Sequence, residues 1–494
     1  MKMASFLPIV LQFFCCISAI EAIPIFLPPP SLLQSKPSLK SNVSYKTHFF
    51  PQVLDHFTFV PQSYKLFQQK YLTNSEYWGG PSTKAPIFVY AGNEGKIEWF
   101  AENTGFMFDI APKFRALLVF IEHRFYGESL PFGKDSSNSS ATLGYLSSQQ
   151  ALADYATLIL SLKKNLSAED CPVVVFGGSY GGMLAAWFRL KYPHIVLGAL
   201  SSSAPILQFD DLTPLTSFYD TVSKAYKDSS NNCFDVIKKS WDELILLGSE
   251  EEGLLKICRN FRACKTASSV YSVRNWLWEA FIYTTMVNYP MKANFLKPLP
   301  ANPVKEMCRI IDSYPPEADT LTKVFAAASL YFNYSGTEKC FEFEKRRDPH
   351  GLSGWNWQAC TEMVMPMSCS EQSMFPPDNY NYTEKAEGCM LEFGVQPRRH
   401  WITTEFGGHR IGMVLRRFGS NIIFSNGMLD PWSGGGVLKN ISDRIVALVT
   451  EKGAHHLDLR FATKEDPDWL IEQRRQEVEI IQSWLDQYYL DLQR

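Results

Sequence analysis

The chain has 494 residues, of which 46% are hydrophobic and 20% are charged, and its formal net charge is −3. This length can form more than one hydrophobic core, and the composition is that of an ordinary globular protein. The sequence contains no basic block, which argues against a nucleic-acid partner.

The first 45 residues are predicted to lie outside the folded domains. Lys2 precedes an apolar stretch from Phe6 to Ile20 and small residues suited to cleavage, so residues 1–22 are predicted to be a secretory signal peptide. Residues 23–45 are rich in proline and serine and are predicted to be a linker or a removable pro-segment. No later segment reaches about 18 uninterrupted apolar residues, so we expect no membrane partner. The expected location is the secretory pathway, with a lysosome, a vacuole or the extracellular space as destination.

The number and position of the cysteines agree with export. Two of the eleven belong to the predicted signal peptide, and eight of the others form one central block, namely Cys233, Cys258, Cys264, Cys308, Cys340, Cys360, Cys369 and Cys389. Such a block in an exported chain predicts up to four disulfides. No C-x₂-C pair is present, so we expect no metal site, and no cofactor is expected either. Cys171 lies outside the block and is predicted to be a free structural thiol.

Six N-x-S/T sequons predict asparagines that lie on the surface and can carry glycans. They are Asn42, Asn138, Asn165, Asn333, Asn381 and Asn440. Each sequon alone is weak support, so only some of the six are expected to be glycosylated.

Strands and helices alternate in the first half of the chain. Apolar strands are predicted at residues 87–90, 116–121, 173–176 and 196–200, and helices at residues 148–165 and 183–192. This alternation predicts an α/β fold, with a parallel sheet and helices on both faces. Residues 46–205 are therefore predicted to be the first part of an α/β domain.

After about Ile206 the alternation stops. Residues 206–400 are mostly helical in pattern, with helices predicted at 273–287 and 321–331, and they carry the cysteine block. Strands return at 421–425 and 444–450, and a helix is predicted at 468–490. We therefore expect a disulfide-linked helical cap domain at 206–400, inserted into an α/β domain that resumes at 401–494.

The stretch from Gly177 to Gly181 has the pattern G-x-S-x-G between a predicted strand and a predicted helix. A serine in such a turn needs a strained backbone, and side chains two residues to either side would clash with the neighbouring elements. The pattern alone also occurs in ordinary Gly/Ser-rich turns. The strand before it and the helix after it favour a nucleophile elbow, with Ser179 as the nucleophile.

The order serine, aspartate, histidine along the chain is that of an α/β-hydrolase triad. Asp430 comes just after a predicted strand, where catalytic residues of open sheets gather, although an aspartate before proline is also common in turns. Of the nine histidines only His455 and His456 follow Asp430, so the residues alone leave both open. The oxyanion hole is predicted from backbone N–H groups, one from Tyr180 and one from Gly92 or Asn93.

Several longer segments resemble one known family. They are residues 54–57 (LDHF), 92–95 (GNEG), 122–129 (EHRFYGES), 177–192 (GGSYGGMLAAWFRLKY), 426–436 (NGMLDPWSGGG) and 453–460 (GAHHLDLR). These motifs resemble the serine peptidase family of prolylcarboxypeptidase and dipeptidyl peptidase II, from about Thr47 to the end of the chain. The resemblance implies an α/β-hydrolase domain with a helical cap and a serine exopeptidase that cleaves after proline. It also implies that His455 completes the triad with Ser179 and Asp430, and that His456 is structural.

The same resemblance implies a set of disulfides. It pairs Cys233 with Cys308, and Cys360 with Cys389. It pairs Cys340 with either Cys258 or Cys264, of which Cys258 is our assignment. Leu215 stands near a position where the family often has a cysteine, which leaves the partner of Cys369 open.

Cleavage after proline requires a small, apolar and rigid pocket, because proline offers a stiff ring and no N–H. The candidates to line it are Trp355, Trp357, Met363, Met365 and Trp432, although each can equally be ordinary core. Glu94, in the turn beside the oxyanion hole, is a candidate to bind a substrate ammonium group, and a solvated or paired turn residue is the alternative.

The wider resemblance, especially at residues 103–106 and 182–192, is closer to the carboxypeptidase branch of the family. It implies release of a single C-terminal residue from peptides with a penultimate proline, at mildly acidic pH. Release of N-terminal Xaa-Pro dipeptides, as by dipeptidyl peptidase II, is one alternative, and a lipase or esterase on the same fold is another. A catalytically inactive binding protein would require loss of the triad, which is present in the sequence. A homodimer is one oligomeric state open to the chain.

Overall fold

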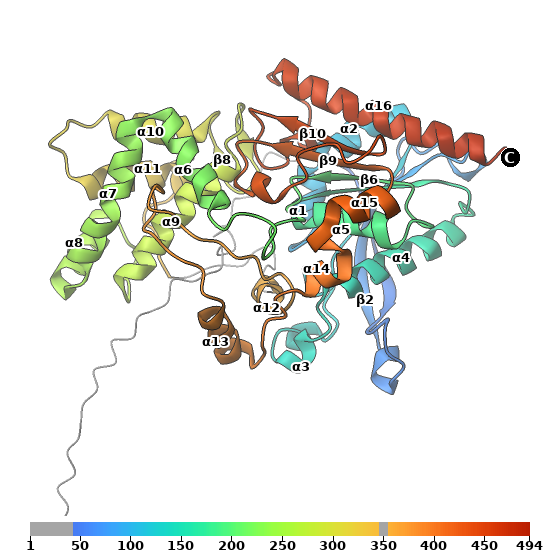
Figure 1. Ribbon diagram of the computed structural model, residues 1–494, viewed down its shortest axis with the longest axis horizontal. Coiled ribbons are helices and arrows are strands. Elements are labelled where there is room, and N and C mark those ends of the chain that lie inside the picture. The colour runs from blue at the N-terminus through green and yellow to red at the C-terminus, as the bar shows by residue number, and fades with distance from the viewer. Residues whose placement is uncertain (1–42, 345–353) are drawn as a thin grey trace, which may run out of the picture.

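The structure of the chain is a computed structural model that describes residues 43–344 and 354–494 (Figure 1). The predicted signal peptide, all but the last three residues of the predicted linker, and the sequon at Asn42 lie outside the described residues. Of the other sequons, Asn138, Asn165, Asn381 and Asn440 are exposed. Asn333 is half-buried, and its side chain forms hydrogen bonds with the backbone of Glu338.

A sheet of eight strands forms the centre of the α/β part, in the order β1-β2-β4-β3-β5-β6-β9-β10. The strands are β1 (Lys46–Val53), β2 (Leu66–Asn74), β3 (Ile87–Ala91), β4 (Leu117–Ile121), β5 (Val173–Gly178), β6 (Gly198–Ser202), β9 (Ile422–Gly427) and β10 (Ile445–Thr450). From β4 to β10 neighbouring strands are parallel, whereas β1 and β2 are antiparallel. The six predicted strands are confirmed to within two residues. The β1–β2 hairpin was not predicted, because its exposed strand β1 has no continuous apolar run.

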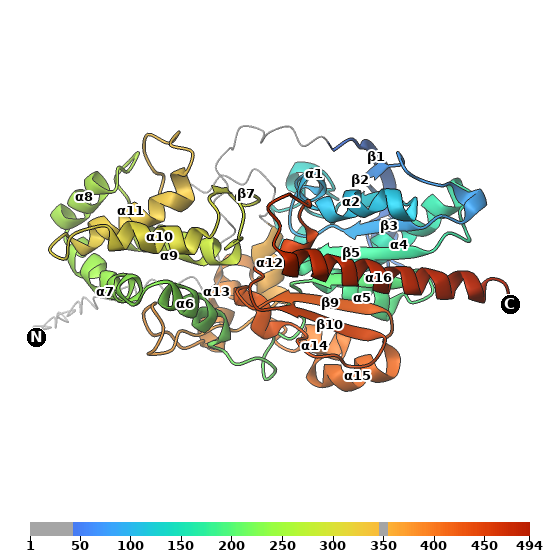
Figure 2. The same cartoon turned by 90° about the horizontal axis from the view of Figure 1, so that it is seen from above.

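Helices cover both faces of the sheet, as Figure 2 shows. The two faces separate alternate residues of each strand, since side chains along a strand point to opposite sides. In β3, Ile87 and Val89 pack with α4 (Ser148–Asn165) and α5 (Tyr180–Lys191), whereas Phe88 and Tyr90 pack with α2 (Gly105–Phe114) and α16 (Asp468–Asp491). A short helix, α1 (Ile97–Asn103), follows β3 on the second face. This is the parallel α/β arrangement that the alternation predicted, and the α/β-hydrolase fold that the family resemblance implied.

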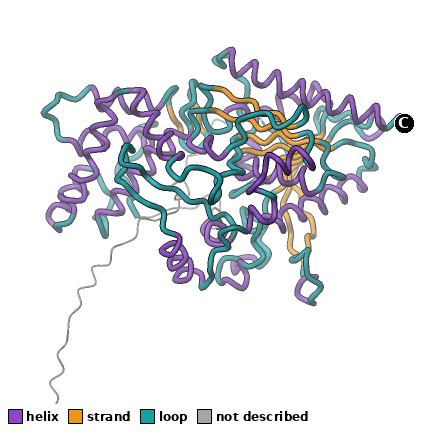
Figure 3. Tube along the Cα trace, viewed as in Figure 1, coloured by secondary structure: helices purple, strands orange, loops and turns teal. Residues whose placement is uncertain are grey.

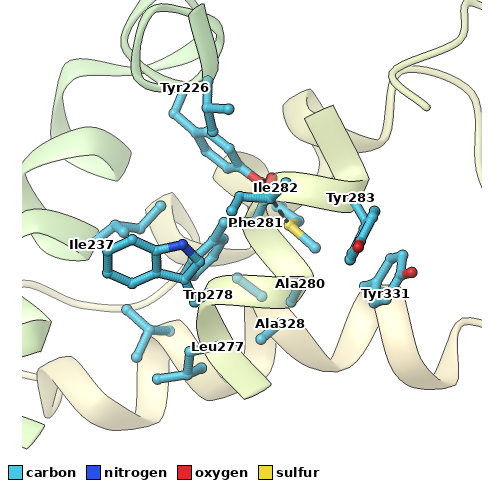
Figure 4. Packing of buried hydrophobic residues seen from close by; sticks show 14 of the residues in the cluster. Tyr226, Ile237, Leu277, Trp278, Ala280, Phe281, Ile282, Tyr283, Ala328 and Tyr331 are labelled. Atoms are coloured by element: carbon cyan, nitrogen blue, oxygen red, sulfur yellow. Dashed lines mark hydrogen bonds between the residues drawn. The ribbon is translucent and has the colours of Figure 1, made fainter. Parts of the chain in front are cut away.

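Between β6 and β9 the chain is almost entirely helix and loop (Figure 3). The first helices of this insertion are α6 (Ser217–Ser229), α7 (Asn231–Gly248), α8 (Glu251–Asn260), α9 (Val270–Met286), α10 (Pro303–Asp312) and α11 (Thr320–Asn333), with a small sheet of β7 (Ala293–Asn294) and β8 (Pro298–Leu299). Helix α9 is their centre, since every residue from Trp276 to Met286 is buried. Figure 4 shows Leu277, Trp278 and Phe281 of α9 among the side chains of its neighbours.

The later part of the insertion packs against the α/β domain instead. Helices α12 (Gly354–Thr361) and α13 (Tyr382–Phe393) lie apart from the α6–α11 group, near α3 (Ser140–Leu143) (Figure 1). Trp357 of α12 shares a hydrophobic cluster with Tyr126 and Leu146. Helices α14 (Trp401–Phe406) and α15 (Ile411–Phe418) then lead into β9. The segment 206–400 thus packs in two places, as the α6–α11 group and as helices against the α/β domain. That these two parts form a single cap domain remains a prediction.

Three disulfides are present among the described residues: Cys233–Cys308, Cys264–Cys340 and Cys360–Cys389. Our assignment of Cys258 to Cys340 is wrong, because Cys258 is a buried free thiol that accepts a hydrogen bond from the Ala267 N–H. The backbone explains the choice of Cys264: its N–H donates to the carbonyl of Phe341, which brings it beside Cys340.

The remaining cysteines of the described chain are free and buried. Burial raises the pKa of the Cys171 thiol, in agreement with its predicted structural role. Cys369 follows Ser368, whose N–H donates to the carbonyl of Leu215. The segment that contains Leu215 thus lies next to Cys369, and leucine in that segment supplies no thiol to pair with it.

Reduction is expected to destabilise the α6–α11 group before the α/β sheet, since Cys233–Cys308 and Cys264–Cys340 cross-link it. Loss of a native disulfide typically lowers stability by about 2–5 kcal/mol. Hydrogen exchange measured with and without a reducing agent should therefore rise first in α7 and α10 and last in β3 and β5. Peptide mass mapping that found the six paired cysteines as free thiols would contradict this expectation.

Candidate active site

Ser179 lies in a strained turn between β5 and α5. Its backbone angles are φ 58° and ψ −126°, a region that non-glycine residues rarely adopt. The Ser179 N–H donates to the carbonyl of Ser202, and its own carbonyl accepts from the Met183 N–H, each at 3.0 Å. A Cβ at Gly177 would lie 2.0 Å from the carbonyl oxygen of Gly181. The glycines are therefore needed for the close approach of strand and helix that presents the serine.

Asp430 and His455 form a buried hydrogen-bonded pair. Asp430 follows β9 and His455 follows β10, so the ends of two adjacent strands bring them together. The distance from His455 Nδ1 to Asp430 Oδ2 is 2.8 Å, and the side chains are only 2% and 1% exposed. The other carboxylate oxygen of Asp430 accepts the Trp432 N–H at 3.1 Å. This arrangement places a proton on Nδ1 of His455 and leaves its Nε2 free to accept one.

The insertion holds His455 through the backbone. Its N–H donates to the carbonyl of Met286, the last residue of α9, at 3.0 Å. Its carbonyl accepts from the hydroxyl of Tyr289 at 2.7 Å. The histidine is therefore fixed by the helical insertion as well as by the sheet.

His456 has different surroundings. Its backbone N–H donates to Ser203 Oγ at 2.8 Å, and its Nδ1 accepts from the Arg460 guanidinium at 2.9 Å. Burial lowers the pKa of His456 well below its usual range, and the neighbouring His455 and Arg460 lower it further. His456 is thus a neutral ring bonded to a cation, whereas His455 is bonded to a carboxylate.

One cavity of about 100 Å³ brings Ser179 and both histidines together, whereas Asp430 lies outside its lining and is bonded to His455. It is lined by Asn93, Glu94, Trp99, Phe100, Ser179, Tyr180, Met183, Pro205, Tyr283, Met286, Phe295, Leu296, Trp355, Met365, Trp432, His455 and His456. The lining is mostly apolar, and α9 together with the segment before β8 supplies the wall that faces the sheet. The helical insertion therefore closes the site over the strand ends.

The family model described as serine carboxypeptidase S28 matches residues 52–477. The chain belongs to this family. It is 43% identical to the lysosomal Pro-X carboxypeptidase of Bos taurus over 95% of this chain and 94% of that protein. It is 44% identical to the lysosomal Pro-X carboxypeptidase of Homo sapiens over 93% of this chain and 92% of that protein.

A more distant relative is the prolyl carboxy peptidase like protein 5 of Caenorhabditis elegans, 38% identical over 89% of this chain and 90% of that protein. The S28 family and these relatives make the chain a serine exopeptidase that acts on peptides. A lipase or esterase on the same fold is not favoured. Within the described residues no group of metal-ligating side chains is suited to hold an ion, and no helix is long and apolar enough to cross a membrane.

Four of the six substrate-binding candidates line the cavity of this S28 protein: Glu94, Trp355, Met365 and Trp432. Trp357 does not. It lies two residues after Trp355 on α12, and residues at that spacing point to different sides of a helix. Met363 does not line it either, since it is only 2% exposed in the core beside the sheet.

Much of the cavity wall was not predicted. Tyr283 and Met286 of α9, and Phe295 and Leu296 after it, occur in apolar segments whose sequence pattern is that of an ordinary helical core. Nothing in the spacing of these residues distinguishes a cavity wall from a packed interior. Only their position opposite Ser179 identifies them.

One of the oxyanion candidates is excluded by its hydrogen bond. The Gly92 N–H donates to the carbonyl of Ile121 at 3.0 Å, as part of the parallel sheet, so it is not free to face a substrate. Tyr180 is the first residue of α5, where backbone N–H groups have no partner within the helix. Asn93 lies in the cavity wall. Tyr180 and Asn93 are the two candidates that remain.

A buried network that sequence reasoning missed fixes the side chain of Tyr180. Its hydroxyl lies 3.1 Å from His123 Nε2 and accepts from Gln358 Nε2 at 2.9 Å. Gln358 also accepts from the Tyr126 hydroxyl at 2.5 Å. Because Gln358 and Trp355 belong to the same helix, α12, this network joins one wall of the cavity to the residue after Ser179.

Proposed function

We propose that this S28 protein is a carboxypeptidase that releases one C-terminal residue from peptides ending in Pro-Xaa. The observation that carries the proposal is the mostly apolar cavity that holds the strained Ser179 together with His455, whose ring is bonded to Asp430. The names of the relatives support the proline preference, since those of Bos taurus and Homo sapiens are Pro-X carboxypeptidases.

In the proposed reaction Ser179 Oγ attacks the carbonyl carbon of the penultimate proline. His455 Nε2 takes the hydroxyl proton and passes it to the departing amine of the C-terminal residue, which leaves an acyl-enzyme. Water then attacks the ester with His455 again as base, and Ser179 is restored. Asp430 holds the tautomer of His455 and stabilises its charged form.

The negative oxygen of each tetrahedral intermediate needs hydrogen-bond donors. We assign this role to the backbone N–H groups of Tyr180 and Asn93. The Tyr180 N–H lies at the N-terminus of α5, where the partial positive charge of the helix favours an anion. The network on the Tyr180 hydroxyl keeps that first turn in place.

The proline ring is proposed to lie against Trp355, Met365 and Trp432. All three line the cavity, and they supply the apolar and rigid surface that a ring without an N–H requires. Trp432 is held by two contacts: its N–H donates to Asp430, and its ring packs edge-on against Phe218.

Glu94 is the group in this cavity that bears on the choice of peptide end. Burial raises the pKa of its carboxyl, while the amide of Asn93 donates to it. An ionised Glu94 would attract a substrate ammonium group and repel a carboxylate. A neutral Glu94 is compatible with either, which agrees with a preference for mildly acidic pH.

Two peptides test which end of the substrate is recognised. An N-acylated peptide ending in Pro-Phe should be cleaved at least about tenfold faster than a free-amine Xaa-Pro arylamide, since one lost charge-assisted hydrogen bond changes kcat/KM by about this factor or more. An N-acylated Ala-Phe peptide is the matched control for proline and should be a poor substrate. The reverse order of rates would favour dipeptidyl peptidase activity without changing the triad.

We also propose a cellular location and an oligomeric state for the protein. The predicted signal peptide and the lysosomal relatives support the secretory pathway, with the lysosome or vacuole favoured over release from the cell. A homodimer is supported by exposed apolar residues at the tip of the β1–β2 hairpin, among them Phe59, Tyr64 and Leu66. An apolar patch of this kind is commonly a contact surface.

A further inference from the structure

Two buried carboxyl groups lie beside the histidine segment and take no part in the proposed reaction. Asp458 belongs to the short helix η6 (Leu457–Leu459), two residues after His456, and Glu477 belongs to α16. Their exposed fractions are 3% and 0%. Burial of an ionised carboxylate is unfavourable unless a cation or several donors compensate it. The surroundings of the two groups therefore decide their protonation.

One oxygen of each carboxyl is bonded to a strand. Ser202 Oγ, at the end of β6, donates to Asp458 Oδ1 at 2.5 Å, and Ser425 Oγ, in β9, donates to Glu477 Oε1 at 3.0 Å. Ser425 itself accepts from Gln473 Nε2 at 2.6 Å. The other two oxygens, Asp458 Oδ2 and Glu477 Oε2, have no donor among the described protein groups. Ser202 and Ser425 are register partners on the neighbouring strands β6 and β9, so the two carboxyl groups that they bind lie side by side. The proximity of Asp458 accordingly helps to raise the pKa of Glu477.

Among the described residues no cationic side chain donates a hydrogen bond to either carboxyl group, although the charge of the nearby Arg474 lowers the pKa of both. The titratable groups that face the pair are Arg460, Arg474 and Tyr289. Arg474 donates through Nη1 to the carboxylate of Asp466, and through Nε to the backbone carbonyl of Asp458, not to its side chain. The guanidinium of Arg460 donates to His456. Both arginines thus hold the backbone or the ring of the histidine segment.

Two carboxylates that lie side by side in a buried site repel each other strongly if both are ionised, so one proton between them is the stable state. We propose that Asp458 and Glu477 are positioning residues that share one proton, and that this shared proton holds the His455–His456 segment against the strand ends in acid. The segment is joined at this point to α16 and to the sheet, and loss of the proton places two adjacent buried charges there.

The carboxyl pair of Asp458 and Glu477 is connected to the turn that carries Ser179 and to the segment that carries His455. Ser202, whose hydroxyl binds Asp458, accepts the Ser179 N–H on its carbonyl at 3.0 Å. The next residue, Ser203, accepts the His456 N–H on its hydroxyl at 2.8 Å. Repulsion at the pair therefore acts on the turn that carries the nucleophile and on the segment that carries His455. This connection, unlike the shared proton itself, rests on the proposed assignment of Ser179 and His455.

The direction of the pH effect follows from the folded and unfolded states. Burial raises the pKa of both Asp458 and Glu477 in the folded chain. The unfolded chain loses these protons near pH 4, so above that pH the folded chain binds the additional proton. The stabilisation is complete below about pH 4 and is lost as the pH rises through the folded pKa. The protein is thus expected to be more stable in mild acid than at alkaline pH.

A Glu477→Gln variant tests the shared proton. Glutamine keeps the shape of a protonated glutamate, donates to Asp458 Oδ2 at every pH and cannot ionise. Its melting temperature should match that of the unmodified chain at about pH 5 and exceed it at about pH 8. The alkaline fall in kcat should also move to higher pH. Glu479→Gln, at an exposed site on the same helix, is the matched control and should behave as the unmodified chain does at both pH values.

The proposal is overturned if Glu477→Gln lowers the melting temperature equally at both pH values, or fails to fold at about pH 5, where the amide replaces an equivalent donor. Asp458→Asn carries the same expectation and repeats the test from the other member of the pair. The melting temperature does not depend on activity. A wrong triad would therefore appear as an active Ser179→Ala variant, and a wrong carboxyl pair as an unchanged pH profile of stability.

Discussion

A Ser179→Ala variant is expected to lose roughly six orders of magnitude in kcat, the size of the effect when the serine of such a triad is removed. The variant should keep its fold, because the strained turn is held by the backbone bonds of Ser179 to Ser202 and Met183, and not by its hydroxyl. The rate of hydrolysis of the N-acylated Pro-Phe peptide measures the loss of activity. Circular dichroism shows whether the variant keeps its fold. An active Ser179→Ala variant would exclude this serine as the nucleophile.

The two adjacent histidines supply an internal comparison for the same prediction. His455→Ala should be about as inactive as Ser179→Ala, and the double variant should be little worse, because the members of a triad act as a unit. His456→Ala should retain more activity, since its ring is bonded to Arg460 and to no carboxylate. An inactive His456→Ala with an active His455→Ala would show that the roles of the two histidines are reversed.

The parts of the fold that sequence predicted best are those set by local pattern. The central strands β3, β4, β5 and β9 contain continuous apolar runs, because parallel strands in the middle of a sheet are buried on both faces. The order serine, aspartate, histidine along the chain, and the position of Asp430 just after a strand, then indicated Asp430 as the acid of the triad. The same order limited the base to His455 or His456. The choice between His455 and His456 came from the family resemblance, and the carboxylate on His455 is the physical feature that supports it.

The features that sequence did not predict depend on contacts between distant segments. Trp355 and Trp357 are alike in sequence, and only the orientation of α12 decides which one reaches the cavity. Cys264 rather than Cys258 meets Cys340, because the backbone of residues 262–264 is hydrogen-bonded to Phe341. The excluded oxyanion donor, Gly92, is engaged by Ile121 of the neighbouring strand. Each of these contacts joins residues that are far apart in the sequence, so a local sequence pattern does not reveal it.

An Asp154→Ala variant is expected to lose about 3–5 kcal/mol of stability, because it leaves the buried cation of Arg124 without its partner. Both side chains are fully buried, and Arg124 donates from Nε and Nη2 to the two oxygens of Asp154, each at 2.6 Å. Arg124 Nη1 also donates to the carbonyl of Leu54, and His56 lies 2.8 Å from Asp154. The pair therefore joins the start of the loop between β1 and β2 to helix α4.

This geometry explains two sequence motifs that carry no catalytic group. Residues 54–57 and 122–129 are far apart in the chain, but Leu54 and His56 of the first motif bind the same buried ion pair that contains Arg124 of the second. Loss of the Asp154 carboxylate should therefore loosen the β1–β2 hairpin and also leave the buried Arg124 cation unpaired. Hydrogen exchange should increase in β1 and β2 of the variant before it increases in β5.

Controls separate the buried charge from an ordinary ion pair. Asp170→Ala removes an exposed carboxylate bonded to Lys84 and should change stability by less than about 1 kcal/mol. A double variant, Arg124→Met with Asp154→Leu, should recover part of the stability lost by Asp154→Ala, because apolar residues leave no unpaired buried charge. Recovery will be incomplete, since methionine cannot bind the carbonyls of Leu54 and Tyr145. A double variant less stable than Asp154→Ala would show that these backbone bonds, and not the unpaired cation, dominate the effect.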